Sequence, residues 1–332
     1  MRIKTIGKTI LAAALAAATL LTASCSGSSG VSLTSGAEDR KTVLTVGGEK
    51  VERQEYRYFY LNNKRDLYGA DAALDAAQVA ELKSLTEANI RERHALLLLA
   101  EKYRAKLTDE MAEAAEATVA DFRASMGDDE TYLIALSEQY MTHELFDALT
   151  QESYLAYPVL EKMIDKGEIA VDDAARDAAF ASDEILCLKE IFIQYNTAET
   201  KEIARDRAEE VLGLLTKGGD FEALMSEYSD YNASDLPPEH GYYTMKYDAL
   251  DVVWDTAITL APGEYSVVVE SAYGFHIIKR CEKDAAYMAQ HADEIFENYT
   301  YAKFYEIFEP FAAGLEIKYT GYGESIDYVN LS

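Results

Sequence analysis

The feature that most constrains this fold is a change in sequence pattern near residue 182. Before it, apolar residues recur at helical spacing, whereas Ile185-Leu-Cys-Leu-Lys-Glu-Ile-Phe-Ile193 is a continuous apolar run typical of a buried strand. A second strand-like run covers residues 267–279 around Gly274, and helical patterns over residues 200–216 and 221–228 lie between the two runs. The pattern therefore predicts a region of mixed strands and helices that begins near residue 182.

Helical patterns flank this region on both sides. Thr108 suits a helix N-cap, and Gly127 suits the end of the helix that follows it. Short strands are predicted at residues 42–46 and 315–319. The other predicted helices cover residues 81–103, 132–140, 142–166 (passing Pro158) and 285–311. We expect residues 41–182 and 284–332 to pack together as one mainly helical domain, with residues 183–283 inserted into it.

The N-terminus has the pattern of an export signal. Three basic residues precede an apolar, Ala-rich stretch over residues 10–21, which ends in Leu21-Thr-Ala-Ser-Cys25. This ending resembles a lipobox, and the resemblance implies a signal peptide over residues 1–24 and a lipid, palmitate among its acyl chains, on Cys25. An ordinary secretory signal is the alternative, and the apolar run is shorter than the roughly 20 residues of a transmembrane helix. Residues 25–40 are rich in Ser and Gly and are expected to form a flexible tether.

The chain is strongly acidic. Its formal charge is −28, and removal of the three basic signal residues makes the remainder −31. A nucleic-acid partner is not expected, because phosphate neutralisation needs clustered Lys and Arg. Anionic lipid headgroups would also repel this surface, so membrane attachment should depend on the lipid alone. The acidity favours cationic unfolded clients, or serves solubility only.

Four short motifs occur in order within residues 183–283. They are Lys217-Gly-Gly-Asp-Phe221, Tyr228-Ser-Asp230, Ala261-Pro-Gly-Glu-Tyr-Ser266 and Tyr273-Gly-Phe-His-Ile-Ile-Lys279. Together they resemble a parvulin-type peptidyl-prolyl isomerase domain, and the resemblance implies an α+β fold over residues 183–283, with a small antiparallel sheet flanked by helices. The surrounding layout, with Val46-Gly-Gly-Glu-Lys-Val51 near its start, is similar to the extracytoplasmic SurA/PrsA-type foldases and chaperones.

The resemblance implies a set of polar catalytic residues. His276 matches the second of two histidines that the family places on adjacent strands, and Glu190 occupies the position of the first. A Glu facing His276 would stabilise the imidazolium form. The alternatives are a core histidine and an exposed Glu190 without a partner. The family's Cys or Asp position falls on Tyr231, or on Asp230 if the alignment slips by one residue.

The resemblance also implies an apolar pocket for the proline ring. Leu250 falls at the family's Met position and Trp254 at its Phe position, although core packing is the common fate of a tryptophan. Tyr243 and Phe275 are further predicted substrate contacts. The pocket is thus better preserved than the polar residues.

Two cysteines lie in the predicted strands. If Glu190 and His276 are opposite each other on antiparallel strands, their numbers sum to 466, and 187 plus 281 is 468. Cys187 and Cys281 would then be near cross-strand neighbours on the opposite face of the sheet, either as a disulfide or as two free thiols.

Two functions follow from these observations. The first is a lipid-anchored peptidyl-prolyl isomerase that helps exported polypeptides with X-Pro bonds to fold. The second is a non-catalytic holdase with a degenerate isomerase domain, in which Tyr56, Tyr58 and Tyr60 either line a groove for clients or pack in the core. No cofactor or metal is expected, because the five histidines are scattered and motifs such as His-Glu-x-x-His and Cys-x-x-Cys do not occur.

Overall fold

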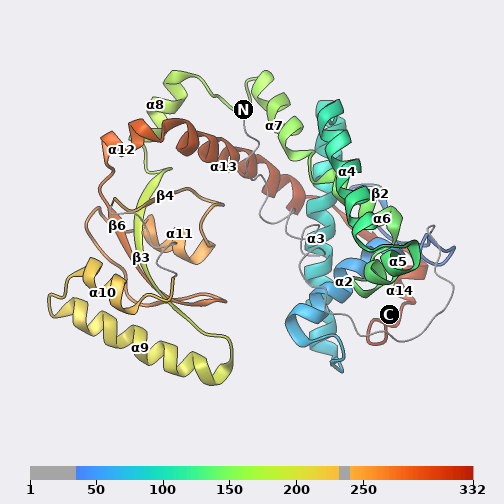
Figure 1. Cartoon of the computed structure of the whole chain (residues 1–332), viewed down its shortest axis with the longest axis horizontal. Helices are drawn as coiled ribbons and strands as arrows, with labels where there is room; N and C mark the ends of the chain where they lie inside the picture. The colour runs from blue at the N-terminus through green and yellow to red at the C-terminus, as the bar shows by residue number, and fades with distance from the viewer. Residues whose placement is uncertain (1–34, 232–239, 332) are drawn as a thin grey trace. The chain divides into compact units, whose positions relative to one another are not determined.

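The computed structural model describes residues 35–231 and 240–331, so Cys25 and the predicted signal peptide lie outside the described residues. Contacts divide the chain into two compact units, Met1–Glu168 with Ile307–Ser332 and Ile169–Glu306 (Figure 1). Helices predominate and both sheets are small and antiparallel, which confirms the predicted α+β class. Within the described ranges, no helix is long and apolar enough to cross a membrane.

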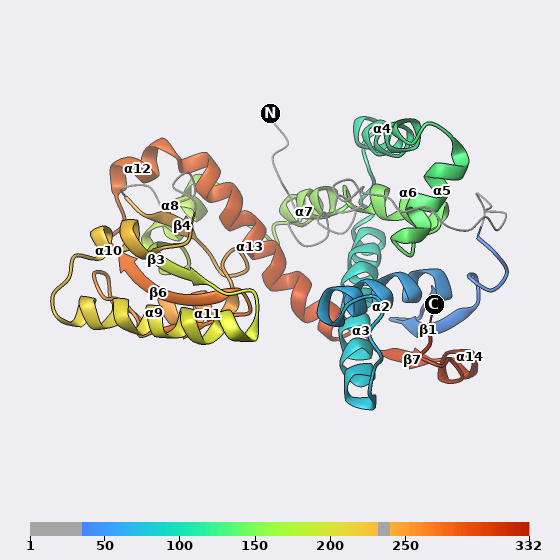
Figure 2. The ribbon, with the colours of Figure 1, turned by 60° about the horizontal axis from the view of Figure 1, so that its bottom comes forward.

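The first unit combines helices with a three-stranded sheet of order β2-β1-β7. Its strands are β1 (Thr42–Val46), β2 (Glu49–Glu52) and β7 (Ile317–Tyr319). Its helices are α2 (Arg53–Tyr68), α3 (Ala76–Tyr103), α4 (Asp109–Ser125), α5 (Asp129–Glu138), α6 (His143–Glu152), α7 (Ala156–Asp165) and α14 (Gly321–Glu324). Figure 2 shows α2 crossing α3, the longest of these helices.

The two ends of the described chain meet in this first unit. Strand β7 pairs with β1 in antiparallel register, with Leu44 opposite Tyr319. The buried Tyr60 hydroxyl donates a hydrogen bond to the Tyr328 carbonyl at 2.8 Å. Tyr56 and Tyr60 are at most 1% exposed, so these tyrosines belong to the core and do not line a client groove. A single apolar core therefore joins sequence segments more than 250 residues apart.

One predicted helix is divided in the structure. The pattern over residues 142–166 predicts a helix that passes Pro158, but α6 ends at Glu152 and α7 begins at Ala156. Pro158 has no N–H group and its ring clashes with a carbonyl four residues earlier, so the helix can accept it only in its first turn. The predicted helix over residues 285–311 is likewise divided, into α12 (Ala285–Gln290) and α13 (Ala292–Ala313).

The second unit contains a four-stranded antiparallel sheet of order β4-β3-β6-β5. Its strands are β3 (Leu186–Gln194), β4 (Tyr242–Thr244), β5 (Val269–Glu270) and β6 (Gly274–Cys281). Its helices are α8 (Asp173–Ala181), α9 (Ala198–Thr216), α10 (Phe221–Tyr228), α11 (Asp251–Ala257), α12 and the first part of α13. The unit is wider than residues 183–283, because Ala179 of α8 and Ile295 of α13 pack with Ile185 in one apolar cluster.

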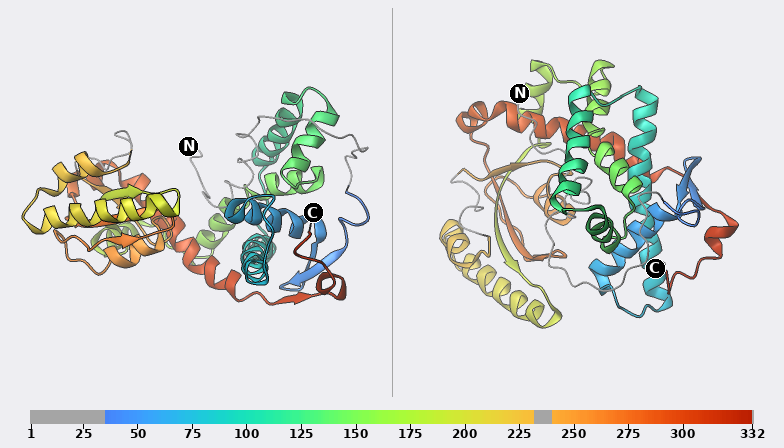
Figure 3. Two further views of the ribbon diagram at one scale, coloured as in Figure 1. Left: turned by 90° about the horizontal axis from the view of Figure 1, so that it is seen from below. Right: turned by 45° about the vertical axis from the view of Figure 1, so that its right-hand side comes forward.

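Alternate residues of the two central strands face different helices. Odd-numbered residues such as Ile191, Ile193 and Ile277 pack against α9 and α10, whereas Leu186, Leu188 and Ile278 pack against α11. Figures 2 and 3 show α9, in yellow, running along one face of the sheet. The sheet is therefore covered on both sides, and a one-residue change in register would exchange the two environments.

Candidate functional site

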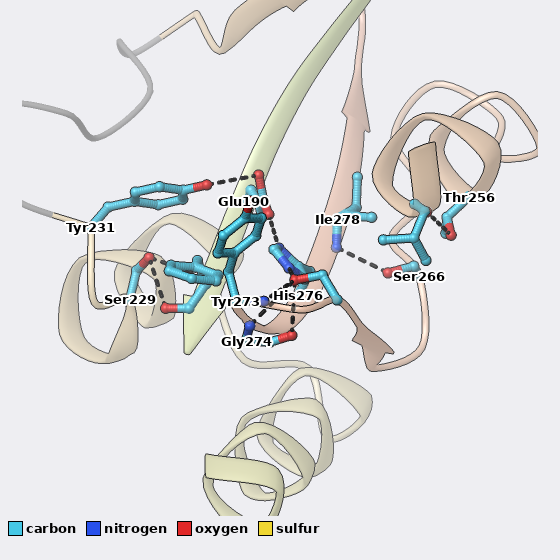
Figure 4. Close-up of polar contacts among 12 residues, drawn as sticks. Glu190, Ser229, Tyr231, Thr256, Ser266, Tyr273, Gly274, His276 and Ile278 are labelled. Carbon is cyan, nitrogen blue, oxygen red and sulfur yellow. Dashed lines mark hydrogen bonds and ion pairs between the residues drawn. The ribbon is translucent and has the colours of Figure 1, made fainter. Parts of the chain in front are cut away.

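A buried histidine–carboxylate pair lies on the α11 side of the sheet. His276 of β6 is 1% exposed and Glu190 of β3 is 3% exposed, and His276 Nδ1 contacts Glu190 Oε1. The structure thus brings together the two residues that the family resemblance implied. Figure 4 shows both side chains on the same face of the sheet.

The register of these strands differs by two residues from the predicted one. Paired residues sum to 468, so Phe192 is directly opposite His276, and Glu190 is opposite Ile278. Glu190 reaches His276 along the diagonal, a separation that long side chains span. The Phe192 ring lies 4.9 Å from the imidazole centroid and 5.0 Å from the Tyr231 centroid. Phe192 therefore packs against His276 and Tyr231.

Gly274 at the start of β6 allows this close approach of the strands. A Cβ atom there would collide with the Ile193 carbonyl oxygen and the Phe192 ring. Only glycine fits without moving the backbone of β3.

The second carboxylate oxygen of Glu190 accepts hydrogen bonds from two tyrosines. Tyr242 donates to Oε2 at 3.0 Å, and Tyr231 donates at 3.4 Å. Burial raises the pKa of both phenols above the ordinary value, and the Glu190 charge raises them further. Both hydroxyls therefore stay protonated and remain donors at every physiological pH.

The segment that carries Tyr231 is attached to β3 beyond the residues that pair with β4. Ser229 Oγ accepts from the Phe192 N–H at 3.1 Å, and the Asp230 N–H donates to the Phe192 carbonyl at 2.7 Å. The Asp230 carboxylate accepts from the Gln194 N–H at 3.0 Å and pairs with Arg207 at 2.8 Å. Asp230 therefore holds the segment in place, and Tyr231 is the residue that reaches Glu190.

Ser271 completes the polar chain on the other side of the imidazole. Its Oγ lies 2.6 Å from His276 Nε2 and accepts from the backbone N–H groups of Tyr273 at 3.1 Å and Gly274 at 3.3 Å. A carboxylate accepts hydrogen bonds, so His276 Nδ1–H faces Glu190, and His276 Nε2 shares a hydrogen bond with the Ser271 hydroxyl, which also lies 3.3 Å from the Gly274 carbonyl oxygen. Every polar group in this hydrogen-bonded series then has a partner.

An open hollow of about 480 Å³ lies beside Ser271. Its lining consists of Tyr195, Leu250, Asp251, Val252, Glu270, Ser271, Ala272 and Tyr273. Leu250 is 40% exposed and Tyr273 is 61% exposed, so both present apolar surface to solvent. The volume lies in the range of small-ligand pockets, and His276 is one hydrogen bond away from it.

The other predicted substrate contacts lie elsewhere in the unit. Trp254 is 8% exposed and packs with Leu188 and Ile278 in the core between the sheet and α11. Phe275 points to the opposite face and packs in the α9 cluster. Tyr243 stacks on Tyr287 at 5.5 Å, also away from Glu190. Of the four predicted pocket residues, only Leu250 lines the hollow.

Three residues of the site were not predicted from sequence. Tyr242 and Tyr243 are adjacent and face opposite sides of β4, so only the pairing of Leu188 with Tyr242 shows which one reaches Glu190. Phe192 became a neighbour of His276 through the two-residue change in register. Ser271 lies in an irregular segment before β6, where no periodic pattern could point to it.

This arrangement differs from a hydrolytic triad despite its serine–histidine–carboxylate order. Acyl transfer needs N–H donors aimed at the place where an oxyanion forms. Here the Tyr273 and Gly274 N–H groups converge on Ser271 Oγ itself. The chain of groups fixes the imidazole and the serine beside a pocket, which suits binding and orientation. In residues 35–231 and 240–331, no group of three or more His, Cys, Asp or Glu side chains could hold a metal ion.

Comparison with known families agrees with both units. Residues 177–284 match a family model described as a PPIC-type PPIase domain, and residues 2–175 match one described as a SurA-like N-terminal domain. The second match covers more than half of the chain. The chain belongs to the SurA-like family.

Three curated relatives of this SurA-like chain are named foldase protein PrsA. The protein from Halalkalibacterium halodurans is 28% identical over 60% of this chain and 61% of its own length. The Bacillus subtilis protein is 35% identical over 24% of this chain and 27% of its own length. The Caldanaerobacter subterraneus protein is 25% identical over 75% of this chain and 78% of its own length. The match to the first relative thus spans about three-fifths of that protein.

Proposed function

We propose that this SurA-like protein is an extracytoplasmic foldase whose second unit is a peptidyl-prolyl cis-trans isomerase. The observation that carries the proposal is the continuous chain from Glu190 through His276 to Ser271, which ends in the wall of the hollow that Leu250 lines. The matched PPIC-type domain and the PrsA relatives support it.

The site is suited to this reaction because rotation about an X-Pro bond needs no nucleophile. The barrier is about 20 kcal/mol and comes from amide resonance. A catalyst lowers it by holding the proline ring, excluding water from the amide and binding the twisted state more tightly than either planar state. Leu250, Val252 and Tyr273 would hold the ring, and Ser271, fixed by His276, would face the amide.

The proposed location is outside the cytoplasm, on the cell membrane. The basic residues and the apolar stretch before Leu21-Thr-Ala-Ser-Cys25 support export and a lipid on Cys25. Labelling cells with a palmitate analogue tests the anchor. The wild-type chain should take up the label and Cys25→Ser should not, whereas equal labelling of the two would exclude Cys25 as the lipid site.

The proposed clients are unfolded exported polypeptides with X-Pro bonds. The chain carries a formal charge of −28, so it would attract cationic segments and repel acidic ones. Cationic clients should therefore associate faster than acidic ones, and added salt should reduce this difference in association rate. The holdase function remains the second proposal, because an open apolar hollow can bind extended chain without catalysis.

A prolyl-peptide isomerisation assay on the full chain separates the two proposals. The wild type should accelerate isomerisation, and His276→Ala should lose most of the acceleration because Ser271 loses its hydrogen bond to the imidazole. His291→Ala is the matched control, since His291 is 40% exposed in its side chain and lies outside the site. A wild-type rate equal to that of buffer would exclude the isomerase.

The same proteins can be tested for suppression of client aggregation. If the wild type is inactive as an isomerase but suppresses aggregation of a denatured client, the holdase is favoured. If both activities are present in the wild type and only isomerisation is lost in His276→Ala, the catalytic proposal holds.

A further inference from the structure

We propose that Cys187 and Cys281 form a reversible dithiol–disulfide site, in which Cys281 reacts first with a low-molecular-weight disulfide and Cys187 then closes the intramolecular bond. The site is independent of the proposed isomerase activity. It lies on the opposite face of the same two strands that carry Glu190 and His276.

The strand register places the two cysteines directly opposite each other. Cys187 pairs with Cys281 in the antiparallel ladder of β3 and β6. The Arg280 N–H donates to the Glu264 carbonyl, and the Arg280 carbonyl accepts from the Gly263 N–H, so both groups point away from β3. The neighbouring odd-numbered residues of β6 therefore make the backbone hydrogen bonds to β3. Cα atoms of such a hydrogen-bonded pair lie about 5.5 Å apart, a distance that a disulfide spans. Both residues are free thiols in the structure.

The two thiols differ in access to solvent. Cys187 is 1% exposed and its thiol donates to the His240 carbonyl at 3.0 Å, whereas Cys281 is partly exposed at the end of its strand. Gly241 packs tightly over Cys187, since a Cβ atom there would lie 2.9 Å from the Cys187 sulfur. An external disulfide can therefore reach Cys281 before it can reach Cys187.

The charges around the pair favour a thiolate on the accessible residue. Lys189 and Lys279 both lie on this face, bonded to Glu222 at 2.9 and 3.0 Å. The neighbouring Cys187 thiol lowers the pKa of Cys281 to about 7, and the two lysines lower it too, against the opposing effects of burial and of the Glu222 charge. The pKa of Cys187 is raised, first by Cys281 and then by burial. Cys281 is therefore the attacking thiol and Cys187 the resolving one.

The reaction balances as two thiol–disulfide exchanges. In the first, the Cys281 thiolate attacks one sulfur of an oxidised disulfide RSSR, the S–S bond breaks and RS⁻ leaves and takes up a proton. In the second, Cys187 gives up its proton and attacks the Cys281 sulfur of the mixed disulfide, releasing the second RS⁻. The protein loses two protons and two electrons, and RSSR takes them up to become two RSH.

Oxidised glutathione is the probe for the experiment. The full chain is purified in detergent with reductant and transferred to buffers in which the ratio of oxidised to reduced glutathione increases. The reaction is stopped with acid, and peptide mass mapping then identifies the state of each cysteine, so that Cys25 is distinguished from Cys187 and Cys281. The wild type should gain a Cys187–Cys281 disulfide and no lasting glutathione adduct. Cys187→Ala should form a stable mixed disulfide between Cys281 and one glutathione. In Cys281→Ala, Cys187 should react with oxidised glutathione at least tenfold more slowly than Cys281 does in Cys187→Ala.

Two results would overturn the proposal. The first is that both cysteines of the wild type can still be alkylated in the most oxidising buffer. This result does not depend on any variant. The second is glutathione uptake by Cys281→Ala at the same rate as by Cys187→Ala, which would show that the thiols do not differ in access.

Discussion

Two buried histidine–glutamate pairs occur in the described part of the chain, and they have different surroundings. His276 and Glu190 lie on adjacent strands of the second unit, whereas His94 and Glu55 lie on α3 and α2 of the first. All four residues are at most 4% exposed. Burial and pairing alone therefore do not distinguish a functional pair from a structural one.

The contacts beyond each pair make the difference. Glu55 also pairs with Arg93, which holds Glu152 with two hydrogen bonds of 2.7 Å, and His94 Nδ1 has no partner among the described atoms. The pair thus closes on itself and joins α2, α3 and α6. His276, in contrast, bonds Ser271 at the wall of an open hollow. Access to a pocket through a second hydrogen bond is what points to function.

The largest expected effect comes from Glu55→Gln, which should destabilise the first unit. Arg93 would remain buried with one carboxylate fewer, and breaking a buried ion pair costs about 3 kcal/mol. The helical circular dichroism signal should be lost at lower urea concentration. Fluorescence of Trp254, the single tryptophan and a residue of the second unit, provides the control and should keep its midpoint. An unchanged circular dichroism midpoint would contradict the structural role of this pair.

Glu190→Gln should reduce the proposed isomerase activity by about a hundredfold, equivalent to about 2.7 kcal/mol of barrier. The amide keeps the shape, but its NH₂ group would face donors, either His276 Nδ1–H or the tyrosine hydroxyls. Steady-state isomerisation rates measure the loss, and circular dichroism confirms folding. Full activity in a folded Glu190→Gln protein would show that the carboxylate charge has no part in the reaction.

A smaller loss, about tenfold or 1.4 kcal/mol, is expected for Ser271→Ala. The substitution leaves His276 Nε2 without a partner, as His94 Nδ1 already is. Ser271→Thr keeps the hydroxyl and should restore most of the activity, which a purely steric role would not produce. If Thr is as inactive as Ala, the hydroxyl is not the group that matters.

The smallest effect, about 1 kcal/mol of added stability, is expected for Glu92→Gln at pH 8. Burial raises the pKa of Glu92 to about 6, with a further contribution from Glu309. A folded-state pKa above the unfolded value of about 4.5 disfavours the charged form, so stability decreases as pH rises through this range. Urea unfolding at pH 4 and pH 8 should show a benefit at pH 8 and almost none at pH 4, which lies below both pKa values. An equal benefit at both values would exclude titration as the cause.

Much of this fold could be predicted because its strands and helices differ in periodicity. The apolar run over residues 185–193 became β3 almost unchanged, and Gly127 follows the end of α4 with a positive φ of 86°. The division between α6 and α7 could not be placed, since the apolar pattern continues across it and only the backbone chemistry of Pro158 interrupts it.

The site could be predicted only in part, because it depends on register. Side chains alternate between faces, so His276 and Glu190 could be assigned to one face, but their diagonal offset could not. The same offset explains why Phe192 was missed. Tyr242 was missed because its neighbour Tyr243 has the same side chain, and Ser271 because it belongs to no regular element.

The most direct test of the central claim compares the two histidines in one measurement. The exchange rate between the cis and trans forms of a single prolyl peptide is measured by NMR with the wild type, His276→Ala and His94→Ala at equal concentrations of folded protein. The account predicts that His94→Ala catalyses exchange as fast as the wild type, whereas His276→Ala is slower by about a hundredfold. Equal rates for the two variants would contradict it.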